Sequence, residues 1–145
     1  MSLVVYKSSA GSGKTTTLVN EYLKITLKNP QVFSSVLAIT FTNKAANEMK
    51  ERILEALLTL STGEGSSRGE FSPVIRFIGL SDSEISQRAK VLLSLILHRY
   101  DEFAVSTIDS FVHRIVRTFA TDVKLPQNFE VVIDNDEIIP EIIEK

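Results

Sequence analysis

The chain has 145 residues, of which 43% are hydrophobic and 23% are charged. A chain of this length can bury a core without disulfides or metal ions, and the composition is that of a globular protein rather than a disordered or fibrous one. Cysteine is absent, which excludes a disulfide scaffold, a thiol nucleophile and a cysteine-ligated metal site. The formal net charge is -2, so binding of nucleic acid would rely on a local site rather than an overall basic field.

No apolar run reaches the roughly 18 residues that a membrane-spanning helix needs. The first residues also lack the charged start and long apolar stretch of a secretory signal. We therefore expect a cytoplasmic protein with no membrane partner. The two histidines are poor material for a metal site, so we expect any catalytic metal ion to arrive with the substrate.

The first part of the chain has the pattern of a strand, a loop and a helix. Residues 3–7 are a short apolar run, residues 8–13 are rich in small residues and glycine, and residues 15–28 have helical spacing of apolar side chains. The predicted apolar face of this helix comprises Leu18, Val19, Tyr22 and Ile25.

A second strand, loop and helix follow. Residues 36–41 have strand character, and residues 45–60 place apolar side chains three or four positions apart. The predicted apolar face of this second helix comprises Ala45, Met49, Ile53, Leu57 and Leu60. Residues 61–69 contain three glycines and no apolar residue, which predicts a surface loop.

The next helix has a clear start signal. Ser81 and Glu84 have the spacing of a capping box, which predicts a helix over residues 85–97. Residues 103–108 then predict a third strand.

The last part of the chain continues the alternation of strands and helices. Asp109 or Ser110 would cap a helix that runs to residue 120, and residues 129–133 predict a fourth strand. This alternation predicts an α/β fold with a mostly parallel sheet flanked by helices.

A phosphate-binding pattern lies between the first predicted strand and helix. Residues 8–15 read Ser-Ser-Ala-Gly-Ser-Gly-Lys-Thr, which matches G-x-x-x-x-G-K-[ST] except for serine at the first position. Backbone N–H groups of such a loop surround phosphate oxygens, Lys14 would reach the β- and γ-phosphates, and the Thr15 hydroxyl would ligate Mg²⁺. The alternative is an accidental glycine-rich turn. The predicted nucleotide-binding residues are Ser9, Ala10, Gly11, Ser12, Gly13, Lys14, Thr15 and Thr16, with Lys14 and Thr15 also catalytic.

Two further segments resemble a known family. Residues 38–53, Ala-Ile-Thr-Phe-Thr-Asn-Lys-Ala-Ala-Asn-Glu-Met-Lys-Glu-Arg-Ile, resemble motif Ia of the UvrD/Rep-type superfamily 1 helicases. Residues 105–111, Val-Ser-Thr-Ile-Asp-Ser-Phe, resemble motif Ib, and both segments follow the phosphate loop in the family's order. The resemblance implies a P-loop NTPase with a RecA-like sheet, ATP and Mg²⁺ as cofactors, and DNA-dependent ATP hydrolysis and translocation.

The same resemblance implies a domain organisation and a DNA site. Residues 1–125 would form part of motor domain 1A, and residues 126–145 would begin an inserted helical subdomain. Single-stranded DNA would cross the sheet against an aromatic ring and polar groups, which grip any base sequence. Asp109 is left out because a carboxylate repels phosphate. The implied DNA-binding residues are Phe41, Thr42, Asn43, Lys44 and Thr107.

Taken without the resemblance, some of these residues have an ordinary structural interpretation. Phe41 could end a strand as a core side chain, because aromatic residues are common in strands. Lys50 and Arg52 are interpreted as charges on the solvated face of a helix.

Other features resemble the RecB and AddA branch of the family. The chain has no glutamine-bearing adenine-recognition segment before the phosphate loop, and its first strand begins almost at residue 1. This likeness implies a helicase–nuclease, with exodeoxyribonuclease activity elsewhere in the parent protein, that acts in double-strand break repair and recombination. The implied partners are single-stranded DNA or duplex DNA ends and a second helicase–nuclease subunit.

The residues that hydrolyse ATP are harder to find. Hydrolysis needs one acidic residue for Mg²⁺ and another that activates water. Asp134 and Asp136 follow an apolar run, but they resemble a strand end or helix cap rather than the family's catalytic acids. Residues 138–145 resemble an apolar helix that is cut short. We therefore expect a truncated motor that binds ATP, hydrolyses it poorly and requires the remainder of the parent helicase.

Two other functions stay open from the residues. A small P-loop nucleotide kinase fits the chain length and the phosphate loop, although an arginine-rich lid segment is missing. The other is a nucleotide-binding module that never hydrolyses its ligand. Motifs Ia and Ib favour the helicase interpretation over both.

Overall fold

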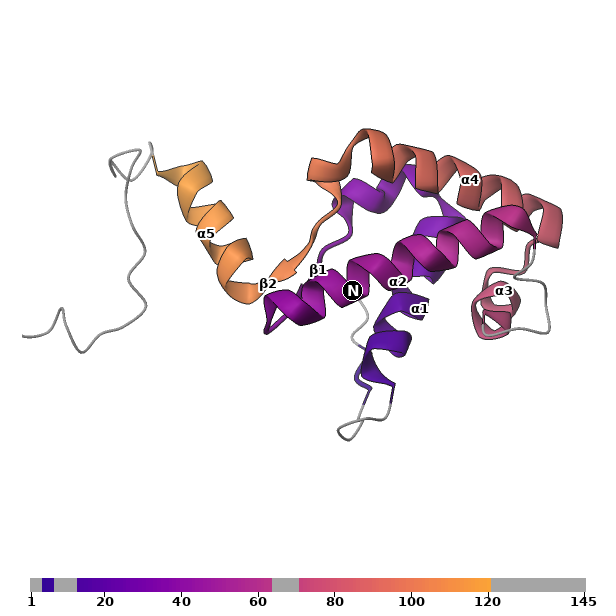
Figure 1. The fold of residues 1–145 in the computed structure, drawn as a ribbon, viewed down its shortest axis with the longest axis horizontal. Coiled ribbons are helices and arrows are strands. Elements are labelled where there is room, and N and C mark those ends of the chain that lie inside the picture. The colour runs from indigo at the N-terminus through magenta and orange to yellow at the C-terminus, as the bar shows by residue number, and fades with distance from the viewer. Residues whose placement is uncertain (1–3, 7–12, 64–70, 121–145) are drawn as a thin grey trace, which may run out of the picture. The chain divides into compact units, whose positions relative to one another are not determined.

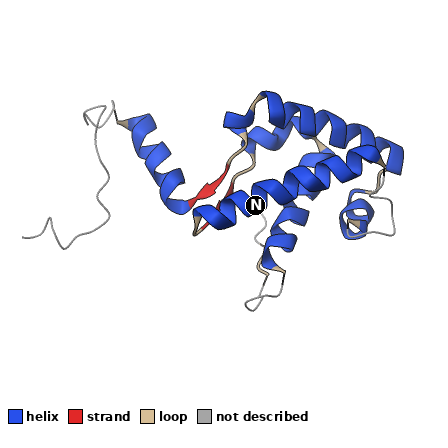
Figure 2. Cartoon of the chain, viewed as in Figure 1, coloured by secondary structure: helices blue, strands red, loops and turns tan. Residues whose placement is uncertain are grey.

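The computed structural model describes residues 4–6, 13–63 and 71–120. Within these residues the chain is an α/β structure in which helices enclose two short strands (Figure 2). The chain divides into two compact units, Met1–Thr107 and Ile108–Lys145, which are described separately below. The predicted boundary at residue 125, the subdomain of residues 126–145 and the strand at residues 129–133 lie outside the described residues.

The sheet of the first unit confirms two of the predicted strands in shorter form. Strand β1 (Ala38–Thr40) and strand β2 (Val105–Thr107) pair in parallel, with Thr40 opposite Thr107. The helices between them make the crossover that a parallel pair requires (Figure 1). The carboxyl ends of both strands therefore meet at one edge of the sheet.

The strand predicted at residues 3–7 is wrong for its described part. Residues 4–6 are not in a strand, and in the described part of the chain the sheet contains only β1 and β2. Val4 and Val5 are 66% and 70% exposed, so the apolar run lacks the hydrogen-bonded neighbour that a strand needs. The Tyr6 hydroxyl instead donates a hydrogen bond to Glu21, 3.0 Å from Oε1.

Helix α1 (Lys14–Lys28) forms where predicted, but its buried face differs from the prediction. Leu18 and Ile25 are 46% and 49% exposed. The packed face is rotated toward Val19, Leu23 and Leu27, which recur at four-residue spacing and are buried. Tyr22 is buried as predicted.

Helix α2 (Asn43–Thr62) confirms the second predicted helix and most of its apolar face. The Thr42 hydroxyl caps its start by accepting a hydrogen bond from the backbone N–H of Ala45 at 3.2 Å. Gly63 ends the helix with φ of 83°, a left-handed conformation that glycine adopts without strain. The buried residues are Ala46, Met49, Ile53, Ala56, Leu57, Leu60 and Ser61, whereas Ala45 is half-buried.

Helix α4 (Asp82–His98) confirms the capping box. The Ser81 hydroxyl accepts from the backbone N–H of Glu84, and the Glu84 carboxylate accepts from the backbone N–H of Ser81. Hydrogen bonds from the Ser81 hydroxyl and backbone lower the pKa of Glu84, the hydroxyl bond most. Sequence reasoning missed three shorter elements: the 3₁₀ helices η1 (Pro30–Ser35) and η2 (Tyr100–Glu102), and helix α3 (Ser72–Ile78).

One hydrophobic core holds the first unit together. Helices α2 and α4 pack side by side, while α1 contacts α2, α3, α4 and η1 (Figure 1). The side chains that are less than 2% exposed come from all of these helices and from β2; the largest are Phe33, Leu23, Leu27, Met49, Ile53 and Leu57.

Arg88 of α4 closes the carboxyl end of α1. Its Nη1 donates to the backbone carbonyl of Leu27 at 3.1 Å and to that of Lys28. A cation at this position interacts favourably with the negative end of the helix dipole and satisfies carbonyls that have no partner within the helix.

We expect Arg88→Met to lower the free energy of unfolding by roughly 1–2 kcal/mol, because it removes charge-assisted hydrogen bonds but keeps an apolar side chain. Urea unfolding measures this change. Lys90→Met, at an exposed position of the same helix, is the matched control. An Arg88→Met variant as stable as the control would contradict the capping role.

The described part of the second unit is helix α5 (Ile108–Phe119) and Ala120. The helix starts one residue before the predicted cap positions, so Ile108 is helical rather than the end of a strand. The Arg114 guanidinium lies 6.0 Å from the ring centre of Phe111 within this unit. None of the helices in the described part of the chain has the length and apolarity of a membrane span.

Candidate nucleotide and DNA site

The nucleotide site predicted from the sequence is centred on the start of α1. Gly13 precedes the helix with φ of 79°, in the left-handed region that favours glycine, and its carbonyl accepts the backbone N–H of Thr17 at 2.9 Å. The helix has no side-chain cap and no acidic residue in its first turn. Its first N–H groups are therefore free of intrahelical partners and face an anion favourably.

The side chains of this first turn match the chemistry of a bound triphosphate. Lys14 is exposed, and Thr15 and Thr16 are half-buried. An exposed ammonium can reach phosphate oxygens, and a threonine hydroxyl is a hard oxygen ligand of the kind that Mg²⁺ accepts. The structure brings together Gly13, Lys14, Thr15 and Thr16. The other predicted loop residues, Ser9, Ala10, Gly11 and Ser12, lie outside the described residues.

Arg52 is a residue of this site that sequence reasoning missed. Its Nη1 donates to the Thr16 hydroxyl at 3.3 Å, and its Nη2 lies 2.7 Å from Oε1 of Glu48. The interpretation of Arg52 as only a solvated charge is wrong, because the guanidinium joins α2 to the first turn of α1. The spacing of Glu48 and Arg52 indicated an ion pair on α2, but no signal in the sequence indicated the partner on α1.

The DNA site predicted from motif Ia begins where β1 ends. Phe41 is 86% exposed, so it is not the core side chain that ordinary strand statistics favour. Thr42, Asn43 and Lys44 are also exposed, and they occupy the cap and first turn of α2. The Thr42 hydroxyl uses an oxygen lone pair for capping, and its own hydrogen remains a donor for another group. An exposed ring beside a helix start and an ammonium is suited to a base and its phosphate.

Two other predicted positions differ from Phe41. Thr107 lies at the carboxyl end of β2, opposite Thr40, and is 5% exposed. Its contact with DNA stays a prediction, for which the hydroxyl must become accessible. Lys50 lies 5.4 Å from the ring centre of Tyr100, so it too packs on a neighbour rather than standing free in solvent.

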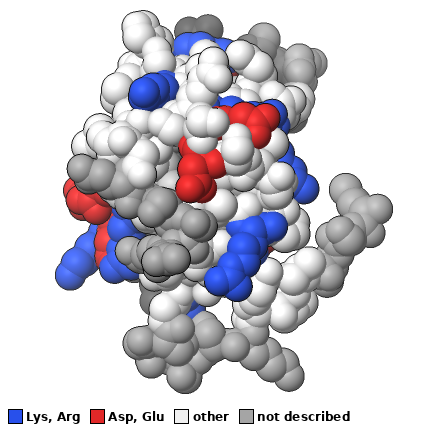
Figure 3. Space-filling view, turned by 90° about the vertical axis from the view of Figure 1, so that its right-hand side faces the viewer, with Lys and Arg blue, Asp and Glu red and all other residues white. Residues whose placement is uncertain are grey.

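Charges on the described surface are mixed. On the face drawn in Figure 3, Lys and Arg side chains are scattered among acidic and uncharged ones instead of forming one basic field. No group of three or more His, Asp or Glu residues that could hold a metal ion occurs among the described residues. Asp134 and Asp136 are outside that part of the chain. Thr15 therefore fits Mg²⁺ as one ligand of an ion that arrives with the nucleotide.

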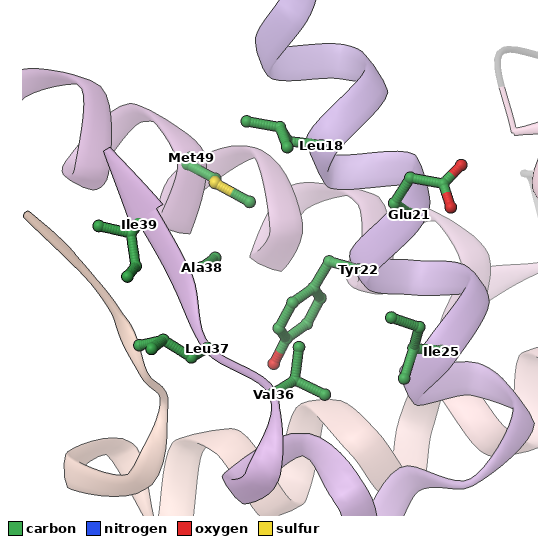
Figure 4. A pocket seen from close by; sticks show the side chains of 9 residues that line it. All are labelled: Leu18, Glu21, Tyr22, Ile25, Val36, Leu37, Ala38, Ile39 and Met49. Carbon is green, nitrogen blue, oxygen red and sulfur yellow. The ribbon is translucent and has the colours of Figure 1, made fainter. Parts of the chain in front are cut away.

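An apolar pocket of about 190 Å³ lies between α1 and β1. The Tyr22 ring points from α1 toward Val36 in this pocket (Figure 4). Its apolar lining is unsuited to phosphates, so the pocket is not the triphosphate site. The lining residues are Leu18, Glu21, Tyr22, Ile25, Val36, Leu37, Ala38, Ile39 and Met49.

The buried Tyr22 hydroxyl has no hydrogen-bond partner within the described part of the chain. Burial raises the pKa of Tyr22 above its ordinary value of 10.0. Because the unfolded chain ionises this phenol at about pH 10, its contribution to stability is complete below that pH and is lost as the pH rises above it. We expect Tyr22→Phe to lose less stability between pH 7 and 11 than the wild type. Urea unfolding at both pH values tests this, with the exposed Tyr100→Phe as control; equal losses for the wild type and Tyr22→Phe would contradict it.

The UvrD/REP helicase N-terminal domain family matches residues 2–145 of the chain. The chain belongs to this family. The predicted membership is thus confirmed, and a small nucleotide kinase is not favoured.

Among the UvrD/REP relatives are three proteins named as the AddA subunit of an ATP-dependent helicase/nuclease. The protein of Lactobacillus gasseri is 36% identical over 134 residues, which are 92% of this chain and 9% of that protein. The Lactobacillus acidophilus protein is 33% identical over the same shares, and the Bacillus cytotoxicus protein is 29% identical over 98% of this chain and 10% of its own length. No solved structure matches. The predicted branch is confirmed, and the chain spans about a tenth of the length of these relatives.

Proposed function

We propose that the chain is the ATP-binding N-terminal part of a DNA helicase motor with a RecA-like sheet. The observation that carries the proposal is the start of α1, where left-handed Gly13 leads directly into Lys14 and an uncapped first turn. Lys14 binds the β- and γ-phosphates, the Thr15 hydroxyl ligates Mg²⁺, and the turn's N–H groups hold phosphate oxygens. Residues Ser9 to Ser12 complete the loop, and Thr16 closes the turn.

The DNA-binding surface of the proposed motor is the junction of β1 and α2. Phe41 stacks on a base, and Thr42, Asn43 and Lys44 hold the backbone of a single strand. The support for this assignment is the 86% exposure of Phe41, which leaves its ring free to stack. Thr107 is proposed as a further contact at the same edge of the sheet.

The parent protein is proposed to be a helicase–nuclease of double-strand break repair and recombination. Its support is the name of the relatives, which describes a subunit of an ATP-dependent helicase/nuclease. The name also supports a partner in the form of a second subunit, with single-stranded DNA or duplex ends as the substrate. We propose that the present chain supplies nucleotide and DNA binding but little hydrolysis, because the parent motor provides the catalytic acids elsewhere.

The DNA assignment predicts that Phe41→Ala weakens binding of a single-stranded oligonucleotide by roughly tenfold. Base stacking on an aromatic ring contributes about 1–3 kcal/mol, and about 1.4 kcal/mol corresponds to tenfold in affinity. Fluorescence anisotropy at fixed salt concentration measures the change. Phe77→Ala is the matched control, because Phe77 is also exposed but lies on α3. Equal affinity for the wild type and Phe41→Ala would contradict the assignment.

A further inference from the structure

Helix α2 connects the two halves of the proposed site. Its start carries Thr42, Asn43 and Lys44, which are proposed to hold DNA, and Arg52 on the same helix reaches the first turn of α1. The ten positions between Thr42 and Arg52 correspond to about 15 Å along a helix. A helix of this length moves largely as a rigid element, so a displacement at its start is transmitted to Arg52.

The Arg52 guanidinium makes two different contacts. Nη1 donates to the Thr16 hydroxyl at 3.3 Å, while Nη2 lies 2.7 Å from the Glu48 carboxylate. The Glu48 and Arg52 side chains are 44% and 45% exposed, and ion pairs this accessible to water add little to stability. The shorter contact with Glu48 instead fixes the direction of the guanidinium, since a planar fork can serve both partners only in a restricted orientation.

We propose that Arg52, oriented by Glu48, couples DNA binding at the start of α2 to nucleotide binding at the start of α1. Both are positioning residues: Arg52 acts through Thr16, which adjoins Lys14 and Thr15, and Glu48 acts through Arg52. DNA that shifts α2 changes the hold of Arg52 on Thr16 and thereby the geometry of the phosphate-binding turn. By linkage, nucleotide binding changes DNA affinity by the same factor. This inference rests on the proposed function.

The coupling is measured with a non-hydrolysable ATP analogue and Mg²⁺, titrated into the 145-residue chain with and without a saturating single-stranded oligonucleotide. We expect DNA to change the analogue's Kd by about fivefold or more in the wild type. Arg52→Gln brings this ratio close to 1, and Glu48→Gln reduces it partly. Arg88→Gln is the control, because Arg88 contacts α1 at its opposite end and its loss leaves the ratio unchanged.

A second variant separates positioning from folding and charge. Arg52→Lys keeps the positive charge but cannot serve Thr16 and Glu48 with a planar fork, so it also loses the coupling. Thermal unfolding of each variant shows whether it is folded.

Two results would overturn the inference and leave the proposed function intact. One is full coupling in a folded Arg52→Gln or Arg52→Lys variant, and the other is a wild type that binds the analogue through Lys14 with no effect of DNA. Failure of the wild type to bind the analogue would contradict the proposed function itself.

Discussion

Lys14→Ala is expected to weaken binding of Mg²⁺–ATP by roughly tenfold to a hundredfold. The exposed ammonium at the start of α1 is the one side-chain cation that the phosphate-loop pattern assigns to the β- and γ-phosphates. Hydrogen bonds to charged groups contribute about 1.5–3 kcal/mol, and each 1.4 kcal/mol corresponds to about tenfold in Kd. Isothermal titration calorimetry with ATP and Mg²⁺ measures the change.

The control for this variant is Lys90→Ala. Lys90 is an exposed lysine on α4, so the substitution changes the net charge equally without touching the phosphate-binding turn. We expect Lys90→Ala to bind ATP as the wild type does. Similar losses in the two variants would show that ATP responds to overall charge, and the assignment of Lys14 would then be wrong.

Phe33→Ala is expected to lower the free energy of unfolding by about 3–5 kcal/mol. Phe33 is 0% exposed, and η1, which carries it, packs against α1 and α4. The Arg99 guanidinium lies 5.3 Å from the centre of its ring. Truncation removes apolar contacts and leaves a cavity where these elements meet. Because small domains are stable by only about 5–15 kcal/mol, the loss is a large part of the total.

Urea unfolding of Phe33→Ala and Phe77→Ala separates core packing from the general effect of losing an aromatic ring. Phe77 is 58% exposed, and the ammonium groups of Lys24 and Lys28 lie over its ring at 5.0 and 4.6 Å. We expect Phe77→Ala to cost less than about 1 kcal/mol. A Phe33→Ala variant that loses no more than this would mean that η1 is not anchored in the core.

Local signals in the sequence predicted the elements that have strong periodicity or caps. The apolar spacing of α2 and the Ser81–Glu84 capping box both correspond to what forms. Such signals act within a few residues of the chain, so they can be recognised without knowing the tertiary structure. The short elements η1 and α3 have too few turns to show a period, and they depend on packing around Phe33 and Val74.

Tertiary contacts explain the remaining differences. Leu18 and Ile25 fit the period of an apolar face on α1, but the helix packs through Val19 and Leu23 instead. The contact of Arg52 with Thr16 spans 36 positions, and the packing of α1 beside α2 creates it. The phosphate-loop and motif Ia residues were predicted from their wording, and the exposure of Phe41 needed the structure.

The most direct test of the central claim is to map, by amide NMR of the 145-residue chain, which residues respond to Mg²⁺–ATP and which respond to a single-stranded oligonucleotide. We predict that ATP perturbs the amides of residues 13–16 and that the oligonucleotide perturbs those of residues 41–44. Perturbations by ATP that cluster around the apolar pocket of α1 and β1, or an oligonucleotide that leaves residues 41–44 unchanged, would contradict the account.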